Sequence, residues 1–139
     1  MRLTSLFLAD HAEALRGKFY VTGGGWDAIN VRRLPAVHPH MCVAVALEVG
    51  WNDTDVDHEI DVKLLDEDGR SLLPGRVGGK ARAARQPTAR PGDTAPLLLV
   101  FKLLGVKFER AGDYNVTVEV DSVPVGSVRL KVRQINQPR

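Results

Sequence analysis

The chain has one cysteine, no long hydrophobic run and almost no helical periodicity, and each shortage excludes a class of protein. Because Cys42 is the only cysteine, no internal disulfide can form, which fits a reducing compartment. No stretch approaches the ~18 apolar residues that span a bilayer. The apolar run Leu3–Ala9 stops at Asp10 and is too short for a secretory signal. The sequence therefore predicts a cytoplasmic protein with no membrane partner.

The composition predicts one compact domain over residues 1–139. With 44% hydrophobic and 26% charged residues, the chain can build a core without a metal or a disulfide. No internal repeat and no Ser/Gly-rich linker divides it. A net charge of +2 does not imply a nucleic-acid or membrane partner.

Alternation of apolar and polar residues with a period of two is the main structural signal, and it is typical of β-strands. The alternation is clearest in four segments, which are Met41–Gly50, Glu59–Leu65, Tyr114–Asp121 and Val128–Arg133. Weaker patterns predict further strands at Leu3–Ala9, at Pro96–Leu104 and at an edge near Val77–Ala84. We expect Lys18–Thr22 and Trp26–Val31 to form one bulged strand.

Seven to nine short strands, with turn residues about every ten positions, predict an all-β fold. We expect a single antiparallel β-sandwich of the immunoglobulin-like or C2-like type. The segment Asp66–Gly69 has the residues of a hairpin turn, and it lacks the later ligands of a calcium loop.

The charges are unevenly distributed. Nine acidic residues lie between Glu48 and Asp68, and six basic residues lie between Arg70 and Arg90. We interpret these blocks as cross-strand ion pairs, which also predicts that Glu119 and Asp121 face the basic residues of Val128–Arg133. The less favoured alternative is an anion-binding or nucleic-acid-binding patch made of Arg76, Lys80, Arg82, Arg85 and Arg90.

The segment Gly23–Asp27, of sequence GGGWD, is the most distinctive motif. Consecutive glycines permit positive φ angles and close approach of the backbone to a phosphate. A phosphate loop would also need a following helix and usually a lysine, and both are missing. The motif therefore indicates a bulge or tight corner, with Trp26 packed against the core.

The histidines leave a metal site open as an alternative. His38 and His40 stand at i and i+2, and His11 with Asp10, or His58, could supply a further ligand. A zinc site needs three or four convergent ligands, and this spacing alone does not guarantee convergence. Cys42 is expected to be buried and inert.

Several separated motifs resemble a family of small uncharacterised bacterial proteins. The matching segments are Phe7–Glu13, Gly17–Val21, Gly23–Asp27, Val49–Thr54 with His58, and Leu65–Gly69. This resemblance covers nearly the whole chain and implies no established activity, cofactor or site. The basic segment Gly78–Arg85 departs from it.

Two functions remain open from the sequence. The first is a non-catalytic binding or scaffolding module without a cofactor, acting as a homo-oligomer or with a protein partner. Its candidate binding residues are Asp10, His11, Gly24, Trp26, Asp27 and Trp51. The second is a small metal-dependent or acid/base enzyme using Asp10, His11, His38 and His40. No serine lies in a Gly-x-Ser-x-Gly elbow, so no catalytic residue is assigned.

Overall fold

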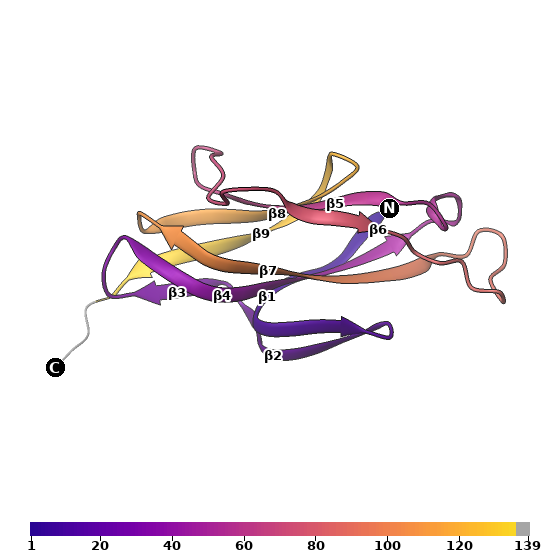
Figure 1. The fold of residues 1–139 in the computed structure, drawn as a ribbon, viewed down its shortest axis with the longest axis horizontal. Helices are drawn as coiled ribbons and strands as arrows, with labels where there is room; N and C mark the ends of the chain where they lie inside the picture. The colour runs from indigo at the N-terminus through magenta and orange to yellow at the C-terminus, as the bar shows by residue number, and fades with distance from the viewer. Residues whose placement is uncertain (136–139) are drawn as a thin grey trace.

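The computed structural model describes residues 1–135, and these residues form β-strands joined by turns (Figure 1). The strands are β1 (Arg2–Leu15), β2 (Lys18–Trp26), β3 (Ala28–Val31), β4 (Ala36–Val49), β5 (His58–Leu65), β6 (Val77–Ala81), β7 (Ala95–Phe108), β8 (Gly112–Val120) and β9 (Val123–Gln134). One short 3-10 turn, η1 (Trp51–Asp53), follows β4. The predicted all-β class is confirmed. Nowhere in residues 1–135 is there a helix with the length and hydrophobicity needed to cross a bilayer.

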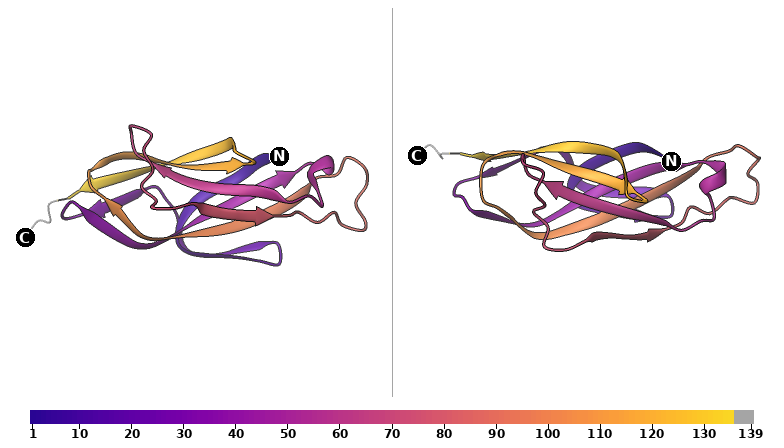
Figure 2. Two further views of the ribbon diagram at one scale, coloured as in Figure 1. Left: turned by 45° about the horizontal axis from the view of Figure 1, so that its top comes forward. Right: turned by 90° about the horizontal axis from the view of Figure 1, so that it is seen from above.

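The strands form two sheets that lie over one another (Figure 2). One sheet has four antiparallel strands in the order β2-β1-β4-β7, and the other has five in the order β3-β9-β8-β5-β6. The second sheet is mixed, because β3 runs parallel to β9. The expectation of a purely antiparallel arrangement is therefore wrong at this edge.

The main core lies between the two sheets, and the period of two in the sequence selects its members. Alternate residues of β4 (Met41, Val43, Val45, Leu47) and of β5 (Ile60, Val62, Leu64) are almost completely buried there. They meet alternate valines of β8 and apolar residues of β7 and β9. These are the faces that the sequence pattern predicts to point inward.

The prediction of one strand across Lys18–Thr22 and Trp26–Val31 is wrong. The chain leaves the four-stranded sheet after Trp26 and enters the five-stranded sheet at Ala28. Between them, the carbonyl of Asp27 accepts a hydrogen bond of 2.8 Å from the Lys131 amide. β2 therefore includes the triple glycine and ends at Trp26, and Asp27 marks a crossing between the sheets.

The interpretation of the charge blocks is correct for β5 and wrong for the last hairpin. The Arg76 guanidinium pairs with Glu59 and Asp61, and Arg82 Nε lies 2.9 Å from Asp57 Oδ1. Glu119, however, pairs with Lys63 of β5 at 3.0 Å instead of with a basic residue of β9. The reason is the register of the hairpin, which places Glu119 opposite Pro124 and sets Arg129 and Lys131 opposite Asn115 and Asp113.

The Asp66–Gly69 segment forms the predicted turn. Asp66 Oδ1 accepts hydrogen bonds of 2.9 Å from the amides of Asp68 and Arg70. Gly69 has a φ of +79°, a backbone conformation that side chains disfavour. The carboxylate therefore organises the backbone of the turn itself.

A buried tyrosine secures the connection between β7 and β8. The Tyr114 hydroxyl donates a hydrogen bond of 2.6 Å to the carbonyl of Arg110, four residues earlier. The ring packs edge-on against Phe108, with their centroids 5.1 Å apart. Burial raises the pKa of Tyr114, so the hydroxyl keeps its proton and remains a donor.

Candidate functional site

The register between β1 and β4 brings two histidines and the cysteine to one place. Ala9 lies opposite Cys42 at the end of this antiparallel ladder. Continuing two residues along each strand, in opposite directions, brings His11 to His40. His40 and Cys42 stand at i and i+2 on β4, so they project to the same face of the sheet.

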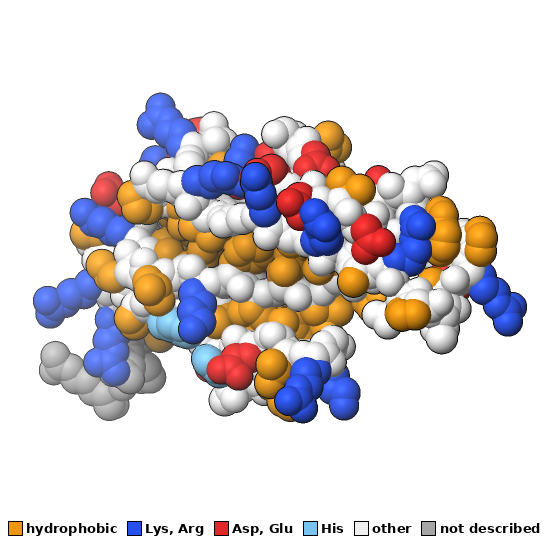
Figure 3. All heavy atoms as spheres, turned by 45° about the vertical axis from the view of Figure 1, so that its right-hand side comes forward, with side chains coloured by type: hydrophobic (Ala, Val, Ile, Leu, Met, Phe, Trp, Pro, Cys, Tyr) orange, Lys and Arg blue, Asp and Glu red, His pale blue; other side chains and the backbone are white. Residues whose placement is uncertain are grey.

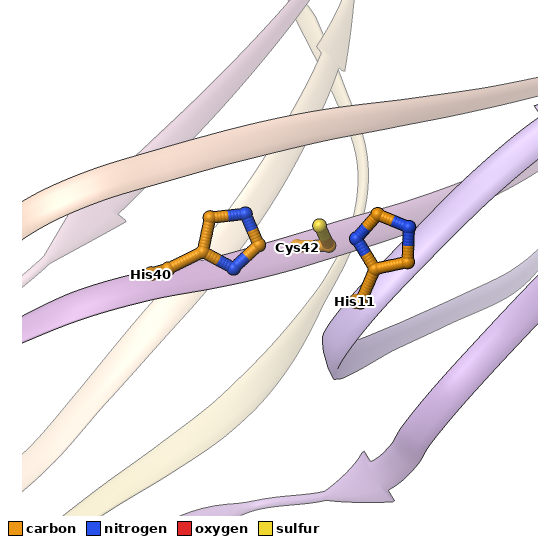
Figure 4. Close-up of side chains that lie close together, drawn as sticks. All are labelled: His11, His40 and Cys42. Atoms are coloured by element: carbon orange, nitrogen blue, oxygen red, sulfur yellow. The ribbon is translucent and has the colours of Figure 1, made fainter.

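The side chains of His11, His40 and Cys42 form what we call the His–His–Cys cluster. One ligand atom from each residue lies within 4.8 Å of the other two. The two imidazole rings flank the Cys42 sulfur (Figure 4). Cys42 is completely buried beside Ala9 and Ala12, whereas His11 is about half exposed. The cluster therefore has a buried thiol end and a solvent-facing imidazole end.

A hydrogen bond orients the His40 ring, and a longer polar contact orients the His11 ring. His40 Nδ1 lies 2.9 Å from the carbonyl of Asp10. A carbonyl only accepts, so Nδ1 carries the proton and Nε2 keeps a free lone pair. His11 Nε2 lies 3.5 Å from Glu13 Oε1, and the other ring nitrogen, Nδ1, turns toward Cys42 (Figure 4). Each ring thus presents one nitrogen to the interior of the cluster.

His38 does not join this cluster, although it stands two residues from His40. Leu104, opposite His40, is 67% exposed, but Val106, opposite His38, is buried in the main core. The side chains of these two pairs therefore point to opposite faces of the sheet. Gly105, which lies between Leu104 and Val106, has a φ of +61°.

As a result, His38 packs against Trp26, with ring centroids 6.0 Å apart. Burial lowers the pKa of His38 and favours its neutral form, although the charge of Asp10 opposes this shift. Its Nε2 has no hydrogen-bond partner among residues 1–135.

The triple glycine forms the predicted bulge, and the close contacts explain its composition. A register shift occurs where Leu8 faces Trp26 and Ala9 faces Gly24. A Cβ at Gly23 would lie 2.3 Å from the Asp10 carboxylate, and one at Gly24 would lie 2.5 Å from Val21 Cγ1. Trp26 is half-buried against the main core, and its Nε1 donates to the Gly23 carbonyl at 2.9 Å.

The remaining predicted site residues lie elsewhere. Trp51 and His58 follow Val49, the last residue of β4. At ~3.3 Å per residue along the strand, Val49 lies about 35 Å from His38. Arg85 covers Trp51, with its Cζ 3.5 Å from the ring centroid. Both nitrogens of His58 are held, one by Asp121 and one by the Asp53 carbonyl. The structure therefore brings Asp10, His11, Gly24 and Trp26 to one region and leaves Trp51 and His58 outside it.

A second notable surface is the free edge of β7. This strand pairs with β4 along thirteen positions, and no strand within residues 1–135 pairs with its other edge. Its residues Leu97–Phe101 are all only half-buried. Between β7 and the end of β1 lies an open groove of about 440 Å³ whose lining includes Ala12, Leu15, Leu98 and Val100. Figure 3 shows hydrophobic side chains gathered in a long strip on this side of the molecule.

Sequence reasoning missed the role of Cys42 in the cluster. The pattern His-x-Cys on one strand was available as a signal, since residues two apart share a face. The third member depends on strand pairing, which the sequence does not reveal.

The fold and the cluster define an all-β protein of two facing sheets with potential metal ligands on an outer face. The chain belongs to a family of unknown function, DUF6941, whose model matches residues 4–133. Membership of a family without an established activity is thus confirmed.

No curated protein matches the chain. Among solved structures it is similar to the Pseudomonas fluorescens alkylpurine DNA glycosylase AlkC bound to DNA containing an abasic site analog. The TM-score is 0.43 and the identity 12%, over 92% of this chain and 30% of that one. The chain therefore spans less than a third of that protein, and a likeness at this level supports no conclusion about function.

Proposed function

We propose that this protein is a non-catalytic, immunoglobulin-like β-sandwich module that assembles with a second copy of itself through the free edge of β7. The observation that carries the proposal is an edge strand of fourteen residues, apolar on both faces over Leu97–Phe101, whose outer edge is unpaired within residues 1–135. Such an edge presents free backbone donors and acceptors that readily pair with another strand. Its exposure is best explained as an interface.

The immunoglobulin-like assignment is supported by the two facing sheets and by Tyr114. A tyrosine near the start of a strand, bonded through its hydroxyl to the backbone a few residues upstream, is a feature of that fold. The parallel β3–β9 pair also fits a module in which one short strand leaves the first sheet to border the second.

The sequence of β7 is compatible with antiparallel self-pairing. With a twofold axis at Val100, Leu99 faces Phe101 of the second copy and Leu98 faces Lys102. Residues directly opposite each other then project to the same face, as pairing requires. The register keeps the two copies of Lys102 apart, and it joins the two four-stranded sheets into one sheet of eight strands. A symmetric interface of this kind closes at two copies.

Light scattering after size exclusion, from about 1 μM to about 1 mM, tests the proposal. We expect a monomer–dimer equilibrium. L98K places a lysine opposite Lys102 at two symmetric positions, whereas L98E places a carboxylate there. Since each cross-strand charge pair contributes ~0.2–1 kcal/mol, and two repulsive pairs replace two attractive ones, L98K should dimerise at least about fourfold more weakly than L98E.

The double variant L98K/K102E is the matched control, because it reverses the charges and restores the attraction. Circular dichroism should show the same strand content in all three variants. A monomer over the whole concentration range, or equal dimerisation of L98K and L98E, would overturn the proposal. Capture of another protein by a strictly monomeric chain would overturn it as well.

A further inference from the structure

We infer that His11, His40 and Cys42 bind one transition-metal ion of the zinc and copper class, at the point where β1 leaves its pairing with β4. This site goes beyond the self-association proposed above and does not depend on it. The metal site uses side chains of β1 and β4, whereas self-association uses the free edge of β7, so either proposal can fail without the other.

The geometry needs only a small adjustment to hold an ion. Ligands about 2.0–2.3 Å from a tetrahedral ion lie about 3.5 Å from each other. The three ligand atoms already lie within 4.8 Å of one another. His11 can make the adjustment because its side chain is 48% exposed and is held only by the 3.5 Å contact to Glu13. Cys42 and His40, on the central strand β4, provide the fixed part of the site.

The polar contacts around the two rings resemble those of metal-binding imidazoles. Such rings usually donate their second N–H to a carbonyl or a carboxylate, which fixes the tautomer and the orientation. His40 makes this bond to the Asp10 carbonyl at 2.9 Å, and His11 faces the Glu13 carboxylate. The bond to Asp10 therefore leaves His40 Nε2 with a free lone pair for the ion, and Glu13 stands where it can accept from His11 Nε2 once Nδ1 binds.

The ligand types select the metal. A thiolate and two imidazoles favour zinc or copper ions and disfavour Mg²⁺ and Ca²⁺, which prefer oxygen ligands. Binding would replace the Cys42 S–H bond with a metal–thiolate bond and release the proton to solvent. The sulfur has little competing interaction, since its contact with the Ala12 carbonyl is 4.0 Å long. A fourth position remains open on the exposed side of His11 for water or another ligand.

Titration of the tag-free, reduced protein with Co²⁺, followed by displacement with Zn²⁺, tests the site. We expect one equivalent of Co²⁺ to bind with the intense visible bands of a four-coordinate ion and a near-ultraviolet thiolate-to-metal band. C42S should lose the thiolate band. C42S and H11A should each weaken Zn²⁺ binding by more than about 100-fold, because removal of a direct ligand exceeds the 10–100-fold effect of outer partners.

The matched control is H38Q, which changes a histidine of the same strand outside the cluster and should bind Zn²⁺ as the unaltered chain does. The edge variant L98K should also bind it unchanged, which separates this site from self-association. A saturating ion should raise the unfolding temperature by several degrees, and H11A should abolish that rise. Since His11 is exposed, H11A should fold even if C42S does not. Substoichiometric binding, or equal binding by H11A and H38Q, would overturn the assignment.

Discussion

His58 Nδ1 lies 2.8 Å from Asp121 Oδ2, and this contact joins the first residue of β5 to the residue that follows β8. The other ring nitrogen, Nε2, lies 2.8 Å from the Asp53 carbonyl. Both partners are acceptors, so both bonds form only when the ring is protonated. The bond to Asp121 accordingly raises the pKa of His58 above 6.5, against the opposing effect of burial, and it lowers the pKa of Asp121 below 3.8.

These two shifts predict how stability depends on pH. A raised histidine pKa gives stability that is fully present below pH 6.5 and is lost as the pH rises through the raised value. A lowered aspartate pKa gives stability that is present above pH 3.8 and is lost as the pH falls. The contribution of the pair should therefore be greatest between about pH 4 and pH 6.5.

Urea unfolding of the unaltered chain and of D121N, from pH 5 to pH 9, checks this. We expect D121N to be less stable by roughly 1 kcal/mol near pH 5.5, since the carboxylate is half exposed, and the difference should shrink toward pH 9. Asp113 forms none of the ion pairs found in residues 1–135, so D113N is the control. A difference that grows with pH would contradict the assignment of charges.

Arg85 is the second position with a specific prediction. Its guanidinium stacks on Trp51, donates to Thr54 Oγ1 at 2.9 Å and also donates to the Trp51 carbonyl. Lysine keeps the charge but cannot stack and donate in this way. R85K should therefore cost about 1–2 kcal/mol and change the tryptophan fluorescence.

The control for R85K is R82K, because Arg82 forms only an exposed pair with Asp57. Thermal unfolding should place R82K close to the unaltered chain. Equal losses in the two variants would show that stacking on Trp51 contributes nothing beyond charge.

Two adjacent glycines of β6 should respond differently to alanine. A Cβ at Gly78 would lie 2.3 Å from the Ile60 carbonyl oxygen, which is backbone and cannot move without separating β6 from β5. A Cβ at Gly79 would have no atom within 4 Å apart from those of Gly79 and its two chain neighbours. G78A should cost about 1–3 kcal/mol, and G79A should change stability by less than about 1 kcal/mol. Denaturant unfolding measures both, and faster amide exchange in β6 of G78A would identify the cause.

The Tyr114 hydroxyl should contribute to stability through its bond to Arg110. Y114F removes the donor and leaves the ring packed on Phe108, so the expected loss is about 1–2 kcal/mol. Tyr20 is 54% exposed, and Y20F should have almost no effect. Similar free energies of unfolding for the two variants in urea would exclude a stabilising role for the Tyr114–Arg110 hydrogen bond.

The parts of the fold that the sequence could predict are those in which a strand has one buried and one exposed face. In β5, Ile60, Val62 and Leu64 alternate with charged residues, so both the strand and its orientation could be inferred. The pairing of β5 with the basic segment around Arg76 followed from charge. Local patterns suffice wherever neighbouring residues determine the outcome.

The candidate site depends on information that is not local. The i, i+2 spacing of His38 and His40 indicated one shared face, but the two side chains point to opposite faces of the sheet, beside Gly105 with its φ of +61° on the paired strand. His11 reaches Cys42 because of the β1–β4 register. Arg85 reaches Trp51 across 34 positions of the chain. Register and long-range packing therefore decide the members of each cluster.

The direction of β1 and β9, the first and last strands along the chain, has a mechanical consequence. Arg2 begins β1 beside Glu48, at one end of β4, whereas Gln134 ends β9 beside Val31, near the other end (Figure 1). A pulling force between these two residues would act along the strands and load the β1–β4 and β8–β9 ladders in shear. Many hydrogen bonds would then bear the force together instead of opening one after another. Stretching in this direction should meet higher resistance than peeling β2 away from β1.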